Sequence, residues 1–205
     1  MSRVLRVAAA QLGPIARAEP RAEVVDRLLV MLREAAAAGA HLVVYPELAL
    51  TSFFPRWYMD DTAELDWFYE TEMPGPETKR LFDEARQLGV GFHLGYAELT
   101  PDGHRYNTSI LVERDGSVVA TYRKVHLPGH ADNRPDAAYQ HLEKKYFEVG
   151  DLGFPVWQMY DHIVGMCICN DRRWPETYRV MGLKGADLVM LGYNTPNINA
   201  YHPEP

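Results

Sequence analysis

Apolar runs alternate with amphipathic segments along this chain of 205 residues. Short apolar runs predict buried strands, and apolar residues spaced three or four positions apart predict helices. The predicted strands are residues 4–11, 41–45, 90–99, 109–113, 118–122, 163–168 and 187–191. The predicted helices are residues 21–38, 77–88 and 175–183. The first helix carries an apolar stripe formed by Val24, Leu28, Leu32 and Ala35.

The order of these elements predicts an α/β fold, because strand–helix–strand units joined by short connections place helices on the face of a sheet. Asp115 and Gly116 lie between two predicted strands and indicate a hairpin turn. Two long connections, residues 48–76 and 124–156, are rich in aromatic residues, histidine and proline. Long irregular segments in a compact domain often carry functional residues.

Composition narrows the class of protein. Hydrophobic residues make up 47% of the chain and charged residues 24%, which is ordinary for a globular protein of one domain. The formal net charge of −7 argues against nucleic acid or an anionic membrane as the main partner. No apolar run approaches the length that spans a bilayer. Arg6 and Gln11 interrupt the apolar N-terminal run, which therefore suits a first strand better than a signal peptide.

The two cysteines, Cys167 and Cys169, are one residue apart. Such a short loop does not readily close as a disulfide, and a chain without a disulfide framework fits the cytoplasm. Cys169 ends a predicted strand just before the helix that begins near Pro175. Backbone N–H groups and a helix N-terminus there can lower the pKa of a thiol. The alternative is an inert buried cysteine.

Two further charged residues close predicted strands. Glu47 has apolar neighbours, so a partly buried carboxylate with a raised pKa can serve as a general base. Lys124 can stabilise a developing oxyanion, and strand alternation should direct Arg123 to the opposite side. Taken alone, each residue also fits an ordinary solvated charge. Because strand ends at one sheet edge form the sites of α/β enzymes, we expect Glu47, Lys124 and Cys169 to meet.

This combination resembles the nitrilase superfamily of carbon–nitrogen hydrolases, which use a Glu–Lys–Cys triad on an αββα sandwich. The matching segments are residues 46–48, 122–127 and 169–176. Segments similar to the N-carbamoyl-D-amino-acid amidohydrolases are residues 11–19, 53–57, 69–76, 126–130 and 141–144. The resemblance implies hydrolysis of N-carbamoyl-D-amino acids to the D-amino acid, carbon dioxide and ammonia. It assigns Cys169 as the nucleophile that forms a thioester, Glu47 as the base and Lys124 as the oxyanion group.

The same resemblance implies roles for other residues. Glu143 matches the second, supporting glutamate of the superfamily, and the backbone N–H of Asn170 would assist Lys124 at the oxyanion. His126 and His141 match the carbamoylase pattern, and we expect them to line the pocket as hydrogen-bonding scaffold.

Recognition of the substrate carboxylate is the other inferred role. A guanidinium can hold a carboxylate by two hydrogen bonds, and Arg172 and Arg173 follow the candidate nucleophile. A thiolate beside two cations suggests attack on the carbonyl of an anionic substrate. The resemblance implies that arginine here and the segment of Asn194 and Thr195 hold the substrate carboxylate. We also expect at least one of the two arginines to be structural.

Neither a metal nor another cofactor is predicted. His126 and His130 have the spacing of a helical zinc pair. Pro128 and Gly129 between them prevent a regular helix, so the two rings need not face one ion. No glycine-rich phosphate loop is visible in the sequence.

We expect a nitrilase-like domain over residues 1–196 and a tail or truncated end over residues 197–205. Superfamily members continue beyond this point, so the expected sandwich is incomplete, and the full-length protein is expected to form a homo-oligomer (dimer or tetramer). Alternative activities are hydrolysis of N-carbamoylputrescine, β-ureidopropionate or a simple amide. Paired arginines favour an anionic substrate over a cationic putrescine derivative. A catalytically inactive fragment or interaction subunit is the alternative from another class.

Overall fold

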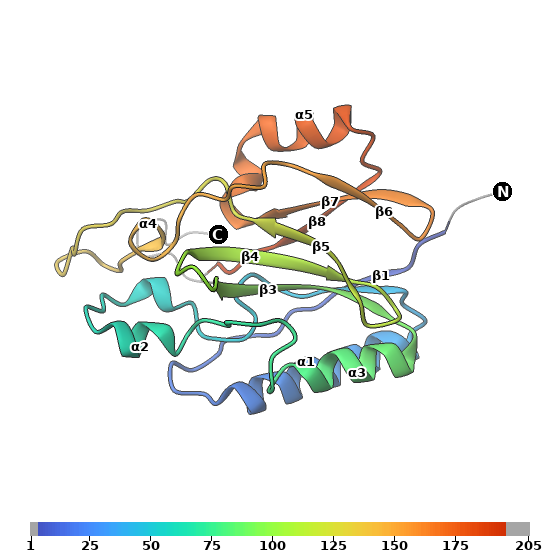
Figure 1. Ribbon diagram of the computed structural model, residues 1–205, viewed down its shortest axis with the longest axis horizontal. Coiled ribbons are helices and arrows are strands. Elements are labelled where there is room, and N and C mark those ends of the chain that lie inside the picture. The colour runs from blue at the N-terminus through green and yellow to red at the C-terminus, as the bar shows by residue number, and fades with distance from the viewer. Residues whose placement is uncertain (1–3, 196–205) are drawn as a thin grey trace.

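Two sheets packed face to face form the centre of the molecule (Figure 1). The computed structural model describes residues 4–195. The first sheet has the order β1 (Val7–Ala9), β2 (Leu42–Val44), β3 (Gly91–Leu99), β4 (Arg105–Val112) and β5 (Val118–Arg123). The second sheet has the order β6 (Val156–Met159), β7 (His162–Ile168) and β8 (Leu188–Gly192). Both sheets are mixed, because parallel pairs β1–β2, β2–β3 and β7–β8 adjoin antiparallel pairs.

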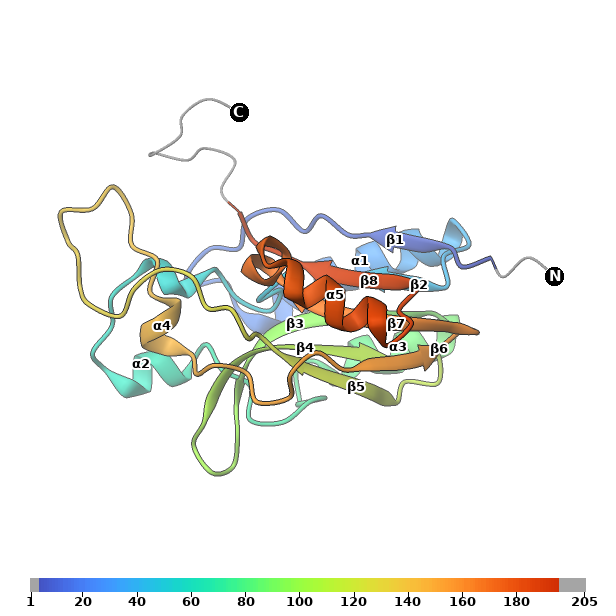
Figure 2. The same cartoon turned by 90° about the horizontal axis from the view of Figure 1, so that it is seen from above.

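Helices cover the outer faces of both sheets and complete the expected αββα order. Helices α1 (Arg21–Ala37) and α3 (Lys79–Leu88) lie on the first sheet, and α5 (Pro175–Leu183) lies along the second (Figures 1 and 2). The stripe predicted on α1 is buried in the core against the first sheet. Gly89 ends α3 in the left-handed region with φ +66°, which glycine adopts without steric strain.

A separate apolar core joins the two sheets. Leu111 and Tyr122 of the first sheet pack in one cluster with Met166 and Ile168 of the second. All four side chains are fully buried. The alternation of side chains along each strand therefore supplies one layer of core between the sheets and another beneath the helices.

Most predicted elements are confirmed, including the hairpin turn, where Gly116 has φ +84° between the antiparallel strands β4 and β5. Strand β4 begins at Arg105, four residues earlier than predicted. The buried polar residues Asn107 and Thr108 hid this part of the strand from an apolar pattern. Strand β6 was not predicted. The two long connections are also less irregular than expected, because they contain a 3₁₀ helix (Phe54–Arg56), α2 (Thr62–Asp66) and α4 (Glu143–Tyr146).

The predicted tail, residues 197–205, lies outside the described residues, as does Pro196 at the end of the predicted domain. Among the helices of residues 4–195, none combines the length and apolar character needed to cross a membrane.

Candidate active site

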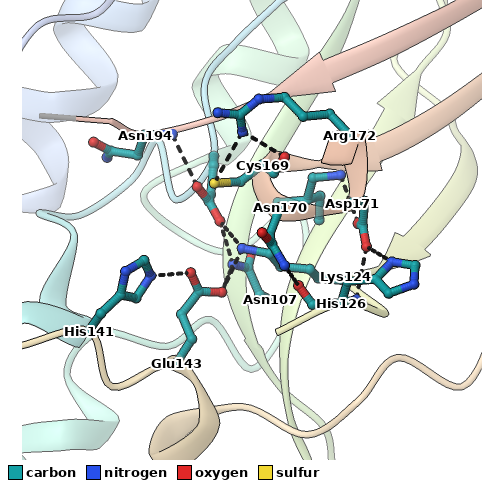
Figure 3. A network of polar contacts seen from close by, with 12 residues as sticks. Asn107, Lys124, His126, His141, Glu143, Cys169, Asn170, Asp171, Arg172 and Asn194 are labelled. Carbon is teal, nitrogen blue, oxygen red and sulfur yellow. Dashed lines mark hydrogen bonds and ion pairs between the residues drawn. The ribbon is translucent and has the colours of Figure 1, made fainter. Parts of the chain in front are cut away.

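Three chain segments bring Glu47, Lys124 and Cys169 together at one end of the sheets. Figure 3 shows Lys124 and Cys169 in this network of polar contacts, with Glu143 beside Lys124. The ammonium of Lys124 lies 2.7 Å from Oε1 of Glu47 and 2.6 Å from Oε2 of Glu143. The side chains of these three residues have no solvent exposure. The thiol of Cys169 is buried beside these groups, and the charges of Glu47, Lys124 and Glu143 all act on it. As predicted, Arg123 points the other way and pairs with Glu98.

Glu47 sits in a turn just beyond β2, and close backbone approach fixes this turn. A Cβ atom on Gly95 would lie 2.9 Å from Cα of Glu47, so glycine is required there. The carboxylate accepts hydrogen bonds from Nδ2 of Asn107 at 2.8 Å and from the backbone N–H of Asn194 at 3.0 Å. Strand pairing, backbone packing and hydrogen bonds thus hold the carboxylate in one orientation.

Cys169 begins a 3₁₀ helix, Cys169–Arg173, that separates β7 from α5. Its φ of +45° lies in the left-handed region, where a residue other than glycine is strained. The buried carboxylate of Asp171 holds the turn, because it accepts hydrogen bonds from the backbone N–H of Ile168 at 3.0 Å and from the hydroxyl of Tyr122 at 2.7 Å. Sequence reasoning missed Asp171, although its position two residues after the cysteine was a signal.

The expected lowering of the thiol pKa is wrong. Burial, followed by the negative charge of Glu47, raises the pKa of Cys169 to about 12. Lys124 acts in the opposite direction but does not overcome these two effects. The resting residue is therefore a thiol, and it needs a base to become a nucleophile.

Glu47 is suited to be that base. Burial raises its pKa, with a further rise from Glu143 and an opposing effect from Lys124. Burial also acts to raise the pKa of Glu143, but Lys124 and His141 outweigh it and lower that pKa. Burial acts to lower the pKa of Lys124, yet Glu47 and Glu143 raise it overall. Lys124 and Glu143 are therefore a stable ion pair, and Glu47 is the carboxylate with increased proton affinity.

The two predicted scaffold histidines occupy different places. His141 contacts Oε1 of Glu143 through Nε2 at 2.9 Å. His126 contacts Oδ1 of Asp171 through Nδ1 at 2.8 Å, and its ring stacks on Trp174. The side-chain amide of Asn170 donates to the backbone carbonyl of His126 at 3.0 Å. His141 thus lies beside the charged cluster, whereas His126 supports the turn that carries Cys169.

Only one of the two predicted arginines borders the thiol. Nη1 of Arg172 donates to the backbone carbonyl of Cys169 at 2.7 Å and lies 3.7 Å from Sγ. Its guanidinium also lies over the ring of Tyr193. Arg173 is exposed, because the 3₁₀ turn directs adjacent side chains to different sides. Of the two arginines expected beside the thiol, only Arg172 is therefore there.

Two cavities adjoin this cluster. The larger, of about 770 Å³, is lined by residues from segments 9–15, 44–46, 51–57 and 191–195, including Asn194 and Thr195. The smaller, of about 350 Å³, is lined in part by His126, Asn170 and Trp174. Neither lining includes Cys169 or Lys124. Within residues 4–195, no three His, Cys, Asp or Glu side chains are grouped so that they could hold a metal ion.

Comparison with known proteins gives consistent matches. The sequence model of the carbon-nitrogen hydrolase family matches residues 6–202. The nitrilase of Pyrococcus abyssi (strain GE5 / Orsay) is 37% identical over 160 residues, which cover 78% of this chain and 54% of that protein. The N-carbamoylputrescine amidase of Solanum lycopersicum is 30% identical over 190 residues, which cover 92% of this chain and 58% of that protein. The citrullinase of Francisella tularensis subsp. tularensis (strain SCHU S4 / Schu 4) is 32% identical over 174 residues, which cover 82% and 55%. The chain thus spans little more than half the length of these curated relatives.

Solved structures share the fold. The carbon-nitrogen hydrolase from Helicobacter pylori G27 has a TM-score of 0.78 at 24% identity, over 96% of this chain and 62% of that one. An amidase from Nesterenkonia sp. has a TM-score of 0.72 at 24% identity, over 92% and 64%. The nitrilase-like fold predicted from the sequence is therefore confirmed.

Proposed function

The chain belongs to the carbon-nitrogen hydrolase family, and from that premise we propose that it hydrolyses N-carbamoyl-D-amino acids through a thioester on Cys169. The observation that carries this proposal is the buried cluster in which Lys124 contacts Glu47 at 2.7 Å and the charges of both residues act on the thiol of Cys169. A thiol, a carboxylate of raised pKa and a fixed ammonium are the groups that acyl transfer from an amide requires.

The proposed reaction begins when Glu47 takes the proton of Cys169 and Sγ attacks the carbamoyl carbon. Lys124 and the backbone N–H of Asn170 stabilise the oxyanion. The C–N bond to the terminal amino group breaks, and ammonia leaves with the proton from Glu47. Glu47 then takes a proton from water, whose oxygen attacks the thioester carbon. The C–S bond breaks, and Glu47 returns the proton to Sγ, which restores the thiol and the carboxylate. The carbamate so formed decomposes to carbon dioxide and the free amino acid.

Supporting and substrate-binding roles belong to the same proposal. Glu143 and His141 orient Lys124, because they form a continuous set of contacts that ends at its ammonium. Arg172 beside the thiol, with Asn194 and Thr195 in the larger cavity, supports recognition of an anionic substrate. Exposed Arg173 has weaker support for this role.

A second candidate is hydrolysis of N-carbamoylputrescine, favoured by the similarity to the tomato enzyme over 92% of this chain. The two candidates differ at the substrate end remote from the carbamoyl group, which is a carboxylate in one and an ammonium in the other. Arg172 near the thiol favours the carboxylate, because like charges repel in a partly buried site.

Ammonia release by the purified chain tests the proposal, with N-carbamoyl-D-methionine, its L-enantiomer and N-carbamoylputrescine as substrates. We expect D-selective release that Cys169→Ala abolishes and that Cys167→Ala, at the other buried cysteine, retains. Release only from N-carbamoylputrescine would support the second candidate. If no substrate is cleaved by this chain or by a longer form of the protein, the alternative of an inactive interaction subunit is favoured.

We also propose a cytoplasmic homo-oligomer without nucleic-acid or membrane partners. The two free thiols support a reducing compartment. Trp174, Tyr178 and Leu183, on and just before α5, are 48%, 40% and 84% exposed, and neighbouring exposed apolar side chains are typical of contact surfaces. Light scattering tests the assembly, and a monomer at every concentration would contradict it.

A further inference from the structure

The larger cavity carries a single charge. Arg56 is the only charged residue among the described residues that line it. Arg56 is half-buried in the segment that follows Glu47. A cavity with one fixed cation is complementary to a ligand with one negative charge.

Among the described residues, the neighbours that orient Arg56 are aromatic rings rather than a carboxylate in an ion pair. Its guanidinium lies 4.3 Å from the ring centre of Tyr139 and 5.6 Å from that of Phe53. Within residues 4–195 it forms no ion pair with a carboxylate, unlike Arg17, Arg21 and Arg27. Stacking orients the planar guanidinium but leaves its N–H donors available for an anion.

A second polar group in the cavity wall, the hydroxyl of Ser52, has no hydrogen-bond partner among the described residues. Ser52 lines the cavity and is 3% exposed, and its hydroxyl makes no hydrogen bond to any described residue. A buried hydroxyl without a partner is costly, and a bound ligand oxygen would satisfy it. Ser52 therefore points independently to a ligand with a hydrogen-bonding oxygen.

The cavity is connected to the reacting groups from two sides. Phe53 packs edge-on against His141, which contacts Glu143 in the charged cluster. Asn194 lines the cavity, and its backbone N–H donates to Glu47. The wall of the cavity is therefore in direct hydrogen-bond contact with the candidate base through Asn194.

We propose that Arg56, assisted by Ser52, binds the carboxylate of the substrate in this cavity and so selects N-carbamoyl amino acids over neutral or cationic amides. This inference rests on the proposed function and adds a specificity residue to it. Arg172 does not line the cavity, so Arg56 adds a second cation to the one beside the thiol. Arg56 is the cation that shares a cavity wall with Asn194 and Thr195.

Equilibrium binding in the Cys169→Ala background tests the proposal without turnover. Calorimetry would compare N-carbamoyl-D-methionine with its neutral carboxamide. We expect the acid to bind more tightly than the carboxamide. Arg56→Gln should weaken binding of the acid by about 10- to 100-fold, the range for a lost charge-assisted hydrogen bond. The affinity for the carboxamide should stay within about twofold of its value without this substitution. Arg56→Lys should be intermediate, because it retains the charge but not the planar fork.

The matched control is Arg179→Gln, which removes the same charge from an exposed position on α5. It should leave both affinities unchanged, and retained binding of the carboxamide shows that each variant is folded. The proposal is overturned if Arg56→Gln weakens both ligands equally, if it weakens neither, or if the acid does not bind. Ammonia release by the wild-type chain tests the proposed function separately. An active enzyme that binds acid and carboxamide equally would refute the role of Arg56 alone.

Discussion

Burial raises the proton affinity of both Glu47 and Cys169, and the negative charge of Glu47 raises that of the thiol further. Lys124 offsets one negative charge, and Glu143 already supplies it. A second ionised group in the cluster therefore adds uncompensated negative charge. Proton transfer from Cys169 to Glu47 moves this charge without adding to it, which explains how a thiol with a raised pKa can still react.

The pH dependence of kcat/KM should report Glu47. As the base it must be ionised, so activity should fall as the pH drops through its raised pKa. The hydrogen bond from Asn107 lowers that pKa. Asn107→Leu should therefore raise the pKa and move the acidic limb of the profile to higher pH. Ammonia release measured across pH tests this expectation.

Thr108→Val is the matched control for this profile. Thr108 neighbours Asn107 on β4, but its hydroxyl bonds Glu98 rather than Glu47. The acidic limb of the Thr108→Val profile should coincide with that of the wild type. An Asn107→Leu limb that stayed in place or moved to lower pH would mean that the profile does not report Glu47.

Asp171 should contribute strongly to stability, because its carboxylate accepts several hydrogen bonds at the turn. In Asp171→Asn, the amide NH2 group would face donors in place of one carboxylate oxygen. The carboxylate accepts hydrogen bonds from the hydroxyl of Tyr122 and from the backbone N–H groups of Ile168 and His126. It also contacts the ring nitrogen Nδ1 of His126. We expect Asp171→Asn to reduce the free energy of unfolding by about 2–3 kcal/mol, and Tyr122→Phe, which removes a single bond, by about 1 kcal/mol. Urea denaturation measures both values. Equal losses would refute a central role for the carboxylate.

At the scale of elements, β3 positions the turn that carries Glu47. A Cβ atom at Gly95 would lie 2.7 Å from the carbonyl oxygen of Pro46 and 2.9 Å from Cα of Glu47. Backbone atoms cannot rotate away, so Gly95→Ala must displace the turn. We expect kcat/KM to fall by about 100-fold, since misplacement of a reacting group by about 1 Å has effects of this size.

Gly182→Ala serves as the control for Gly95→Ala, because a Cβ atom there meets no atom within 4 Å. Gly182 lies within α5, where alanine is favoured over glycine by about 0.5–1 kcal/mol. Its kcat/KM should be unchanged. Full activity in Gly95→Ala would show that the turn tolerates displacement and that β3 does not fix Glu47.

Much of the candidate site could be predicted because Glu47, Lys124 and Cys169 each follow an apolar strand, which is a local pattern. Asn107 could not be found in this way, since it lies inside a strand and its function depends on cross-strand neighbours. Short elements such as β6 were missed for a related reason. They are stabilised by pairing with β7 rather than by a pattern of their own.

The thiol pKa of Cys169 could not be predicted from local sequence either. The prediction considered the helix N-terminus nearby, whereas the structure adds burial and a carboxylate from 122 positions earlier in the chain. Arg56 illustrates the same limit, because its place as the one charged residue among the described residues that line the larger cavity depends on the fold. Distant contacts decide these electrostatic properties.

For the whole molecule, the candidate site depends on the packing of one sheet against the other. Glu47 and Lys124 follow strands of the first sheet, and Cys169 follows a strand of the second. The core between the sheets, which includes Leu111 and Met166, therefore holds the thiol against its base. Loss of this packing should separate the reacting groups even if each sheet kept its hydrogen bonds.

Leu111→Ala tests this dependence. Leu111 is fully buried between the sheets, so truncation should reduce the free energy of unfolding by about 2–5 kcal/mol. Because both sheets share this core, we expect one cooperative transition in urea, with the same midpoint from circular dichroism and from labelling of the buried thiols of Cys167 and Cys169. Leu88→Ala, at a position that is 41% exposed, should change the midpoint little. Thiol labelling that preceded the loss of secondary structure would show that the sheets separate first, and the site would then be less stable than the fold that carries it.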